Sequence, residues 1–146
     1  MSDPSATSAA TITGIHHFSP TVRDVEASAT WYEQVFSMIR VPITFAHHER
    51  EETGYAVMLI DPVSGLAIGL HHNTANQGEA FDEARTGLDH IGFQVASRES
   101  LDAWVTKLDD LGVAHSGVRD ITDPVPFSTL VFRDPDNIQL ELIFSP

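Results

Sequence analysis

The feature that most constrains this chain is an internal repeat with a constant offset of 73 residues. Residues 13–32 (TGIHHFSPTVRDVEASATWY) align with residues 86–105 (TGLDHIGFQVASRESLDAWV), and six of the twenty positions are identical. About one identity is expected by chance from average residue usage. Each half of the chain is therefore expected to fold into the same unit. The identical pairs are Thr13/Thr86, Gly14/Gly87, His17/His90, Val22/Val95, Glu26/Glu99 and Trp31/Trp104.

Each unit predicts a strand, a helix and three further strands. In the second unit, Ser97 is a suitable N-cap and Gly112 a suitable stop for a helix with apolar residues at helical spacing. In the first unit Asp24 is the expected cap, and the apolar positions are Val25, Ala29, Tyr32, Phe36 and Ile39. Strands are expected at about 13–22, 40–47, 55–61 and 66–72, and at about 87–95, 114–119, 127–134 and 138–144. The predicted fold class is α+β, with tandem βαβββ modules at residues 12–72 and 88–146, a polar linker at 73–87 and a disordered tail at 1–11.

The charge and composition narrow the partners and the chemistry. The chain has 8 Lys or Arg residues against 21 Asp or Glu residues, a formal net charge of −13. This argues against nucleic acid and against an anionic membrane surface, because both require clustered basic side chains. The absence of cysteine excludes disulfides and thiolate metal sites. The sequence has neither a secretory signal nor an apolar run of about 20 residues, so we expect a cytoplasmic protein that does not enter a membrane.

Strand parity places three candidate metal ligands on one face. Each helix must cover one face of its sheet, and side chains alternate between the faces of a strand. Bulky apolar residues then face the helices, leaving His17, His90 and Glu141 on the opposite face, here called the inner face. His16 is expected to turn toward the helix side or the sheet edge. An enclosed carboxylate without a partner is costly, so Glu141 needs a cation or solvent. Two imidazoles and a carboxylate suit a divalent ion and leave coordination positions open.

The motifs around these residues resemble those of the vicinal oxygen chelate superfamily of glyoxalases, bleomycin-resistance proteins and extradiol dioxygenases. That family places a histidine before an apolar residue in the first strand of each module, as in HHF (His17) and DHI (His90). It places a glutamate in the last strand after a DPDGN-like turn, as in DPDNIQLEL (Glu141). The resemblance covers residues 12–144. It implies a curved mixed-sheet cup around a metal ion, with the helices on the outer face, and a homodimer.

Two departures from the family pattern narrow the expected site. In glyoxalase I a glutamate in the last strand of the first module is a fourth ligand, and the repeat places Gly69 there. This favours a three-ligand site with open positions. Relatives that modify fosfomycin surround its phosphonate with basic residues, whereas this chain has one lysine and few arginines. The ligand set accepts Fe, Mn, Ni, Zn or Co, and either one chain or two copies could supply it.

Another histidine, His71, is expected on the inner face two residues beyond Gly69. It could replace the missing ligand or act as a general base near pH 7. The competing interpretation is an exposed histidine at a strand end. His47 and His48 are interpreted as residues of a solvated loop, with lining of the cavity mouth as the alternative. With Glu141 and His71 as the expected catalytic residues, the predicted substrate pocket comprises Ser19, Met58, Gly69, His71, Gln94, Phe127, Thr129 and Val131.

These features favour a divalent-metal-dependent enzyme of lyase, isomerase or dioxygenase type. Its expected substrate is a small organic molecule that chelates the metal through neighbouring oxygens. The alternative is a bleomycin-resistance-type protein that sequesters a hydrophobic or cationic drug without chemistry, and the acidic charge balance motivates it. A third interpretation is a regulatory or scaffold domain with a vestigial site.

Overall fold

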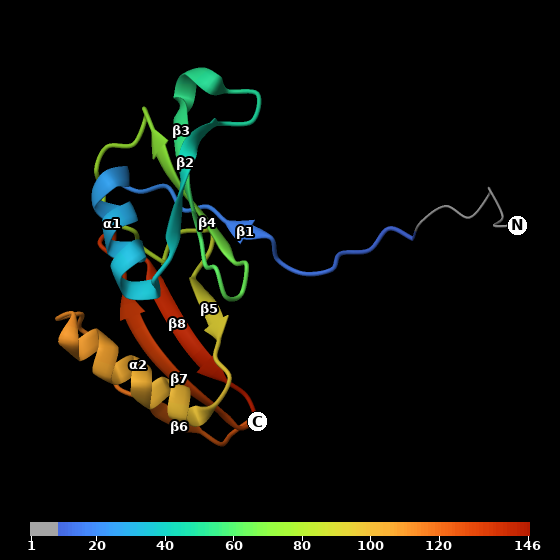
Figure 1. Cartoon of the computed structure of the whole chain (residues 1–146), viewed down its shortest axis with the longest axis vertical. Helices are drawn as coiled ribbons and strands as arrows, with labels where there is room; N and C mark the ends of the chain where they lie inside the picture. The colour runs from blue at the N-terminus through green and yellow to red at the C-terminus, as the bar shows by residue number, and fades with distance from the viewer. Residues whose placement is uncertain (1–8) are drawn as a thin grey trace, which may run out of the picture.

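The repeat is visible in the computed structural model, which describes residues 9–146 (Figure 1). The first module contains β1 (His17–Phe18), α1 (Val25–Phe36), β2 (Ile39–Ala46), the short 3-10 helix η1 (Glu51–Thr53), β3 (Gly54–Ile60) and β4 (Ala67–Asn73). The second contains β5 (His90–Gln94), α2 (Arg98–Asp110), β6 (Arg119–Ile121), β7 (Phe127–Arg133) and β8 (Gln139–Phe144). The strands form two four-stranded mixed sheets of the same order, β1-β4-β3-β2 and β5-β8-β7-β6. The α+β fold built from a repeated βαβββ unit is confirmed.

Both helices begin at the predicted caps. Asp24 caps α1 and Ser97 caps α2, each side chain accepting a hydrogen bond from a backbone N–H of the first turn. Helix α1 ends at Phe36, because Ser37 adopts a left-handed conformation with φ of 55°. The prediction that Ile39 continues the helical stripe is wrong, since this residue begins β2 and is 60% exposed.

The first strand is much shorter than predicted. β1 pairs with β4 over two residues, and an isolated bridge between Thr21 and His71 resumes the pairing further along. Pro20, which lies between them, has no N–H to donate to a ladder, although its carbonyl accepts a hydrogen bond from His71 N at 2.9 Å. In the second module, β6 begins at Arg119 rather than near residue 114. The predicted spans thus fail where proline or irregular backbone interrupts the ladder.

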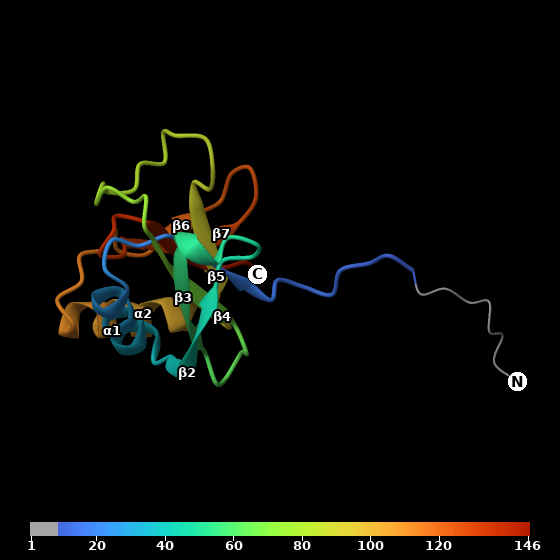
Figure 2. The ribbon, with the colours of Figure 1, turned by 90° about the horizontal axis from the view of Figure 1, so that it is seen from above.

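The two helices lie on the same side of the molecule (Figures 1 and 2), and the two modules share one hydrophobic core. Neither helix is long and apolar enough to cross a membrane. Phe36 joins the halves, because its ring centroid lies 5.5 Å from that of Trp104, 5.1 Å from that of Phe93 and 6.0 Å from that of Phe132. The end of α1 therefore packs against both α2 and the helix-facing side of the second sheet.

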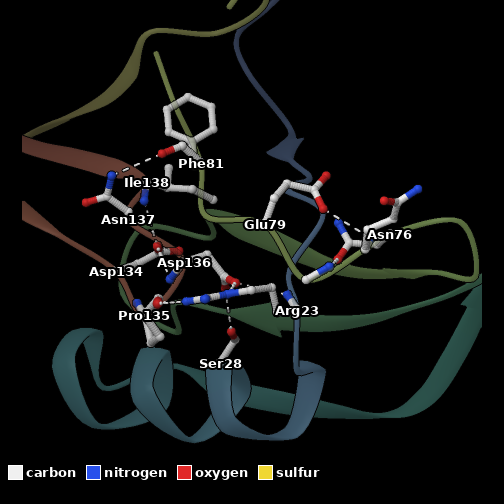
Figure 3. Close-up of polar contacts among 12 residues, drawn as sticks. Arg23, Ser28, Asn76, Glu79, Phe81, Asp134, Pro135, Asp136, Asn137 and Ile138 are labelled. Carbon is white, nitrogen blue, oxygen red and sulfur yellow. Dashed lines mark hydrogen bonds and ion pairs between the residues drawn. The ribbon is translucent and has the colours of Figure 1, made fainter. Parts of the chain in front are cut away.

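A polar cluster also joins the modules, and we call it the latch; Figure 3 labels four of its residues, Arg23, Ser28, Asp134 and Asp136. Arg23 Nε donates to Asp136 Oδ1 at 2.8 Å, and Ser28 Oγ donates to Asp136 Oδ2 at 3.2 Å. Tyr32 OH donates to Asp134 Oδ2 at 2.8 Å. Asp134 and Asp136, in the turn between β7 and β8, are only 6% and 4% exposed. The start of α1 is thereby fixed against the turn that leads into β8.

Candidate metal centre

His90 and Glu141 face each other on the inner face of the second sheet. β5 and β8 are parallel neighbours, and Gly92 is the register partner of Glu141, so His90 lies two residues before that pair. His90 Nε2 lies 3.4 Å from Glu141 Oε2. The Glu141 side chain is 15% exposed, whereas that of His90 is 40% exposed. The structure therefore brings two of the three predicted metal ligands together.

Asp89 sets the orientation of the His90 ring. Its Oδ1 atom lies 2.6 Å from His90 Nδ1. An ionised carboxylate only accepts hydrogen bonds, so the proton of a neutral imidazole is held on Nδ1 and the lone pair of Nε2 is directed toward Glu141. A carboxylate behind a histidine is the usual support of a metal ligand. The sequence interpretation missed Asp89, although an acidic residue directly before a candidate ligand was the available signal.

The pair fits a divalent metal ion by spacing and by charge. Two ligand atoms that each lie about 2.1 Å from one ion, at a roughly tetrahedral angle, are about 3.4 Å apart. This matches the separation between His90 Nε2 and Glu141 Oε2. Among residues 9–146, His90 is also the sole ionisable nitrogen within ion-pair distance of the Glu141 carboxylate. A cation at this point would neutralise a mostly enclosed carboxylate.

The third predicted ligand, His17, lies outside this pair. It is exposed, and its Nδ1 atom lies 2.8 Å from that of His16. β1 begins at His17, so strand alternation does not govern His16, and the expected turn of His16 toward the helix side or the sheet edge stays a prediction. Within residues 9–146, no three His, Asp or Glu side chains come close enough to hold one ion. The three-residue ligand set therefore stays a prediction.

His71 lies beside His47 in the first module. The two rings stack with their centroids 4.7 Å apart and their planes 7° from parallel. Thr53 Oγ1 donates to the Arg50 carbonyl, so it can only accept from His47 Nδ1, which must carry a proton. Burial lowers the pKa of His71, and the positive charges of His47 and His17 lower it further. His71 is therefore half-buried and neutral near pH 7. His47 lies in the predicted loop after β2, where its stacking on His71 leaves it partly buried rather than fully solvated.

Gly69 cannot carry a fourth ligand in this structure. A Cβ atom at Gly69 would lie 2.6 Å from Ser19 Oγ, and Met58 Cε lies 3.6 Å from the same point. In the second module Gly92 takes the place of Ser19, and Glu141 takes the place of Gly69. The glycine is therefore on the other strand of the pair. One position of each cross-strand pair must be small for the other to carry a side chain. A longer residue at position 69 therefore requires the Ser19 hydroxyl to move aside.

A methyl group at Gly69 is accordingly expected to destabilise the chain. Gly69→Ala should lower the free energy of unfolding by about 1–3 kcal/mol, the usual cost of overpacking, and Ser19→Gly in the same chain should restore most of it. Gly92→Ala is the matched control, since its Cβ would meet only Ile143 Cγ2 at 3.9 Å. Urea unfolding of the wild type and of the three variants is the measurement. Equal losses for the two alanine variants would contradict the crowding argument.

The remaining predicted pocket residues are spread over both modules. Register places Phe127, Thr129 and Val131 of β7 on the same face as Glu141, with Val131 directly opposite it. Thr129 Oγ1 is buried and has no hydrogen-bond partner among residues 9–146. Gln94 follows His90 on β5 and is exposed. These side chains extend from the His90–Glu141 pair across the inner face, and their contact with a substrate stays a prediction.

Comparison with known proteins identifies the family. A sequence model of the Glyoxalase/Bleomycin resistance protein/Dioxygenase superfamily matches residues 14–142. The chain belongs to this superfamily. A crystal structure of a glyoxylase/bleomycin resistance protein/dioxygenase domain from Frankia sp. EAN1pec matches with a TM-score of 0.80 and 30% identity, covering 93% of this chain and all of that one. The fold and the family predicted from the sequence are confirmed.

Relatives within the superfamily differ in activity. Metallothiol transferase FosB of Bacillus licheniformis is 28% identical over 138 residues, which are 90% of this chain and 75% of FosB. MhqA of Bacillus subtilis, named as a ring-cleaving dioxygenase, is 26% identical over 121 residues, and the match spans 81% of this chain but 37% of MhqA. A mutant of the fosfomycin resistance protein FosX of Listeria monocytogenes, complexed with Mn(II) and 1S,2S-dihydroxypropylphosphonic acid, has the same fold, with a TM-score of 0.62, 19% identity and 93% of each chain covered.

The charges near the His90–Glu141 pair are unlike a site for an anionic group. Arg133 lies on the inner face of β7, and its Nη2 atom lies 2.6 Å from Glu83 Oε1. This contact lowers the pKa of Glu83 to about 2. Its guanidinium is thus already paired with a carboxylate. Lys107, the single lysine of the chain, lies on α2 with its Nζ 4.9 Å from the centre of the Trp104 ring. Both of these cations are therefore engaged by other side chains of the same chain.

Proposed function

We propose that the chain is a divalent-metal-dependent enzyme of the vicinal oxygen chelate type. His90 and Glu141 of one copy and His17 of a second copy would hold the ion. The observation that carries the proposal is the His90–Glu141 pair, at ligand spacing and backed by Asp89. The metal-bound FosX structure supports the choice of a divalent ion. When bound, the ion would supply Lewis acidity to two neighbouring oxygens of a small organic substrate.

Two observations support a shared site and a homodimer. The latch and the Phe36 cluster fix the modules of one chain relative to each other, and His17 stays outside the His90–Glu141 pair. The inner face of the first sheet is also apolar and uncovered, as expected of a surface that meets a second copy. Its exposed side chains are Ile39 (60%), Ile43 (57%), Phe45 (41%) and Ile60 (37%).

The residues around the ion would have distinct roles. Asp89 keeps the His90 ring oriented, and Glu141 neutralises part of the ionic charge. His71 is the proposed general base, because it lies on the inner face and is neutral near pH 7, so it can accept a proton from a bound substrate. The apolar walls and the paired state of Arg133 favour a substrate without a phosphonate. Lyase, isomerase and dioxygenase chemistry all use such an arrangement.

Metal content tests the proposal directly. The protein is purified without chelator, and bound metal is measured by mass spectrometry for the wild type and for a His17→Ala/Glu141→Ala double variant. We expect about one ion per chain in the wild type and almost none in the double variant. Equally poor binding by both would refute the metal centre. Tight binding of a drug that persists in metal-free protein, without turnover, would instead favour the sequestering alternative.

A further inference from the structure

Two contact regions join the modules, each between the helix of one module and a strand-connecting turn of the other. We call them seams, and their side chains differ. At one seam the latch joins α1 to the β7–β8 turn (Figure 3). The 73-residue repeat defines the equivalent seam between α2 and the β3–β4 turn. There, Asp61 corresponds to Asp134, but Val105 stands where Tyr32 stands in the latch. The second seam has the carboxylate of the latch without its phenol. The other latch residues Arg23, Ser28 and Asp136 correspond to Ala96, Leu101 and Val63.

The second seam is open. Val63 is 94% exposed, whereas its counterpart Asp136 is 4% exposed. A cavity of about 380 Å³ lies between the β3–β4 turn and the aromatic cluster that joins the modules. Asp61, Phe36 and Trp104 line it, and the three predicted metal ligands do not. Gly92 and Gln94 of β5 also line it, so the cavity lies beside the strand that carries His90 without including the three candidate ligands.

The two aspartates lie at the same place in turns that differ by one residue. The backbone N of Asp61 donates to the carbonyl of Leu66, five residues later, whereas that of Asp134 donates to the carbonyl of Ile138, four residues later. Asp134 Oδ1 accepts a hydrogen bond from the backbone N of the residue two positions later at 2.9 Å, and Asp61 Oδ1 does the same at 3.1 Å. In each case Oδ2 accepts from a hydroxyl, that of Tyr32 in the latch and that of Ser64 in the open seam. Ser64 supplies a hydroxyl but no ring, so the apolar space beside Asp61 stays unfilled.

We propose that this cavity binds a small phenol, with its ring against Trp104 and Phe36 and its hydroxyl donating to Asp61. The latch provides the template from within the same chain. There, the Tyr32 ring centroid lies 4.9 Å from that of Trp31, the counterpart of Trp104, and 5.8 Å from that of Phe36. Hydrogen bonds from Ser64 and from backbone N–H groups lower the pKa of Asp61, so the carboxylate is a charged acceptor at neutral pH.

The test uses p-cresol, which is the side chain of tyrosine, and toluene, which lacks the hydroxyl. Binding to the metal-free full chain is followed by NMR shifts of the Trp104 indole and of backbone amides 61–66. We expect a Kd of about 1 mM or tighter for p-cresol, within the range of so small a ligand. Toluene should bind at least about tenfold more weakly, because a hydrogen bond to a charged acceptor is lost.

Variants at the two seams test whether p-cresol binds in this cavity. Asp61→Asn should weaken p-cresol binding about tenfold, and Val105→Tyr, which places a phenol at the position equivalent to Tyr32, should abolish it. Tyr32→Phe is the matched control at the latched seam and should leave p-cresol binding unchanged. If Val105→Tyr does not fold, Asp61→Asn decides. Equal affinity for p-cresol and toluene, shifts that map elsewhere, or no effect of Asp61→Asn would each overturn the proposal. Because no metal is present, the outcome is independent of the proposed enzyme function.

Discussion

An equal mixture of His17→Ala and Glu141→Ala chains, unfolded together and refolded, is expected to recover about one quarter of the wild-type metal sites per chain. Each variant alone should bind almost none. When two copies share each site, a dimer of one His17→Ala chain and one Glu141→Ala chain has one intact site. Its other site carries both substitutions. Random pairing makes about half of the dimers mixed, which gives the expected quarter.

The measurement is metal content per chain, made alongside the molar mass in solution. A His16→Ala variant is the control, because its ring contacts His17 but is not a proposed ligand. It should retain full metal binding with a modest change in stability. A mixture that forms dimers but recovers no metal would place the whole site within one chain. Recovery of a quarter would establish at once that His17 and Glu141 are ligands and that they come from different copies.

The sequence predicted the fold well because the repeat doubles every local signal. The caps Asp24 and Ser97, and the βαβββ order of elements in each module, follow from patterns that occur twice. It failed where a single residue overrides the pattern. Pro20 shortens β1, and the left-handed Ser37 ends α1 before Ile39. Such interruptions depend on backbone geometry that hydrophobic periodicity does not encode.

The site was predictable only in part for a different reason. Strand parity assigns a residue to a face, and it correctly paired His90 with Glu141. Parity says nothing about how two modules are placed relative to each other, so it could not tell whether His17 joins them. Asp89 and His47 were missed because their roles come from contacts with other histidines rather than from the face they occupy.

The latch is expected to be the largest polar contribution to stability. Asp134→Ala should lower the free energy of unfolding by about 3 kcal/mol or more, because it leaves buried donors without an acceptor. These donors are the Tyr32 hydroxyl and the backbone N–H groups of Asp136 and Ile138. Urea unfolding with a two-state fit is the measurement. Glu26→Gln, in the exposed Glu26–Arg40 ion pair, is the matched control and should cost less than about 1 kcal/mol.

Asp134→Asn separates the charge of this residue from its hydrogen bonds. Burial is the main reason that the pKa of Asp134 is raised, with the nearby Asp136 adding to it. A raised pKa in the folded state means that this carboxyl favours folding below its unfolded pKa of about 3.9, and that this contribution is lost as the pH rises through the folded value. The wild type should therefore lose stability relative to Asp134→Asn over that pH range.

At neutral pH we expect Asp134→Asn to cost about 1 kcal/mol, much less than Asp134→Ala, because the amide oxygen still accepts from the two backbone N–H groups. A Tyr32→Phe/Asp134→Asn double-mutant cycle then isolates the phenol–carboxylate contact. If Asp134→Asn lowers the free energy of unfolding as much as Asp134→Ala, the ionised carboxylate itself is required. The hydrogen bonds to the Tyr32 hydroxyl and to the two backbone N–H groups would then depend on the charge of Asp134, which a neutral amide does not supply.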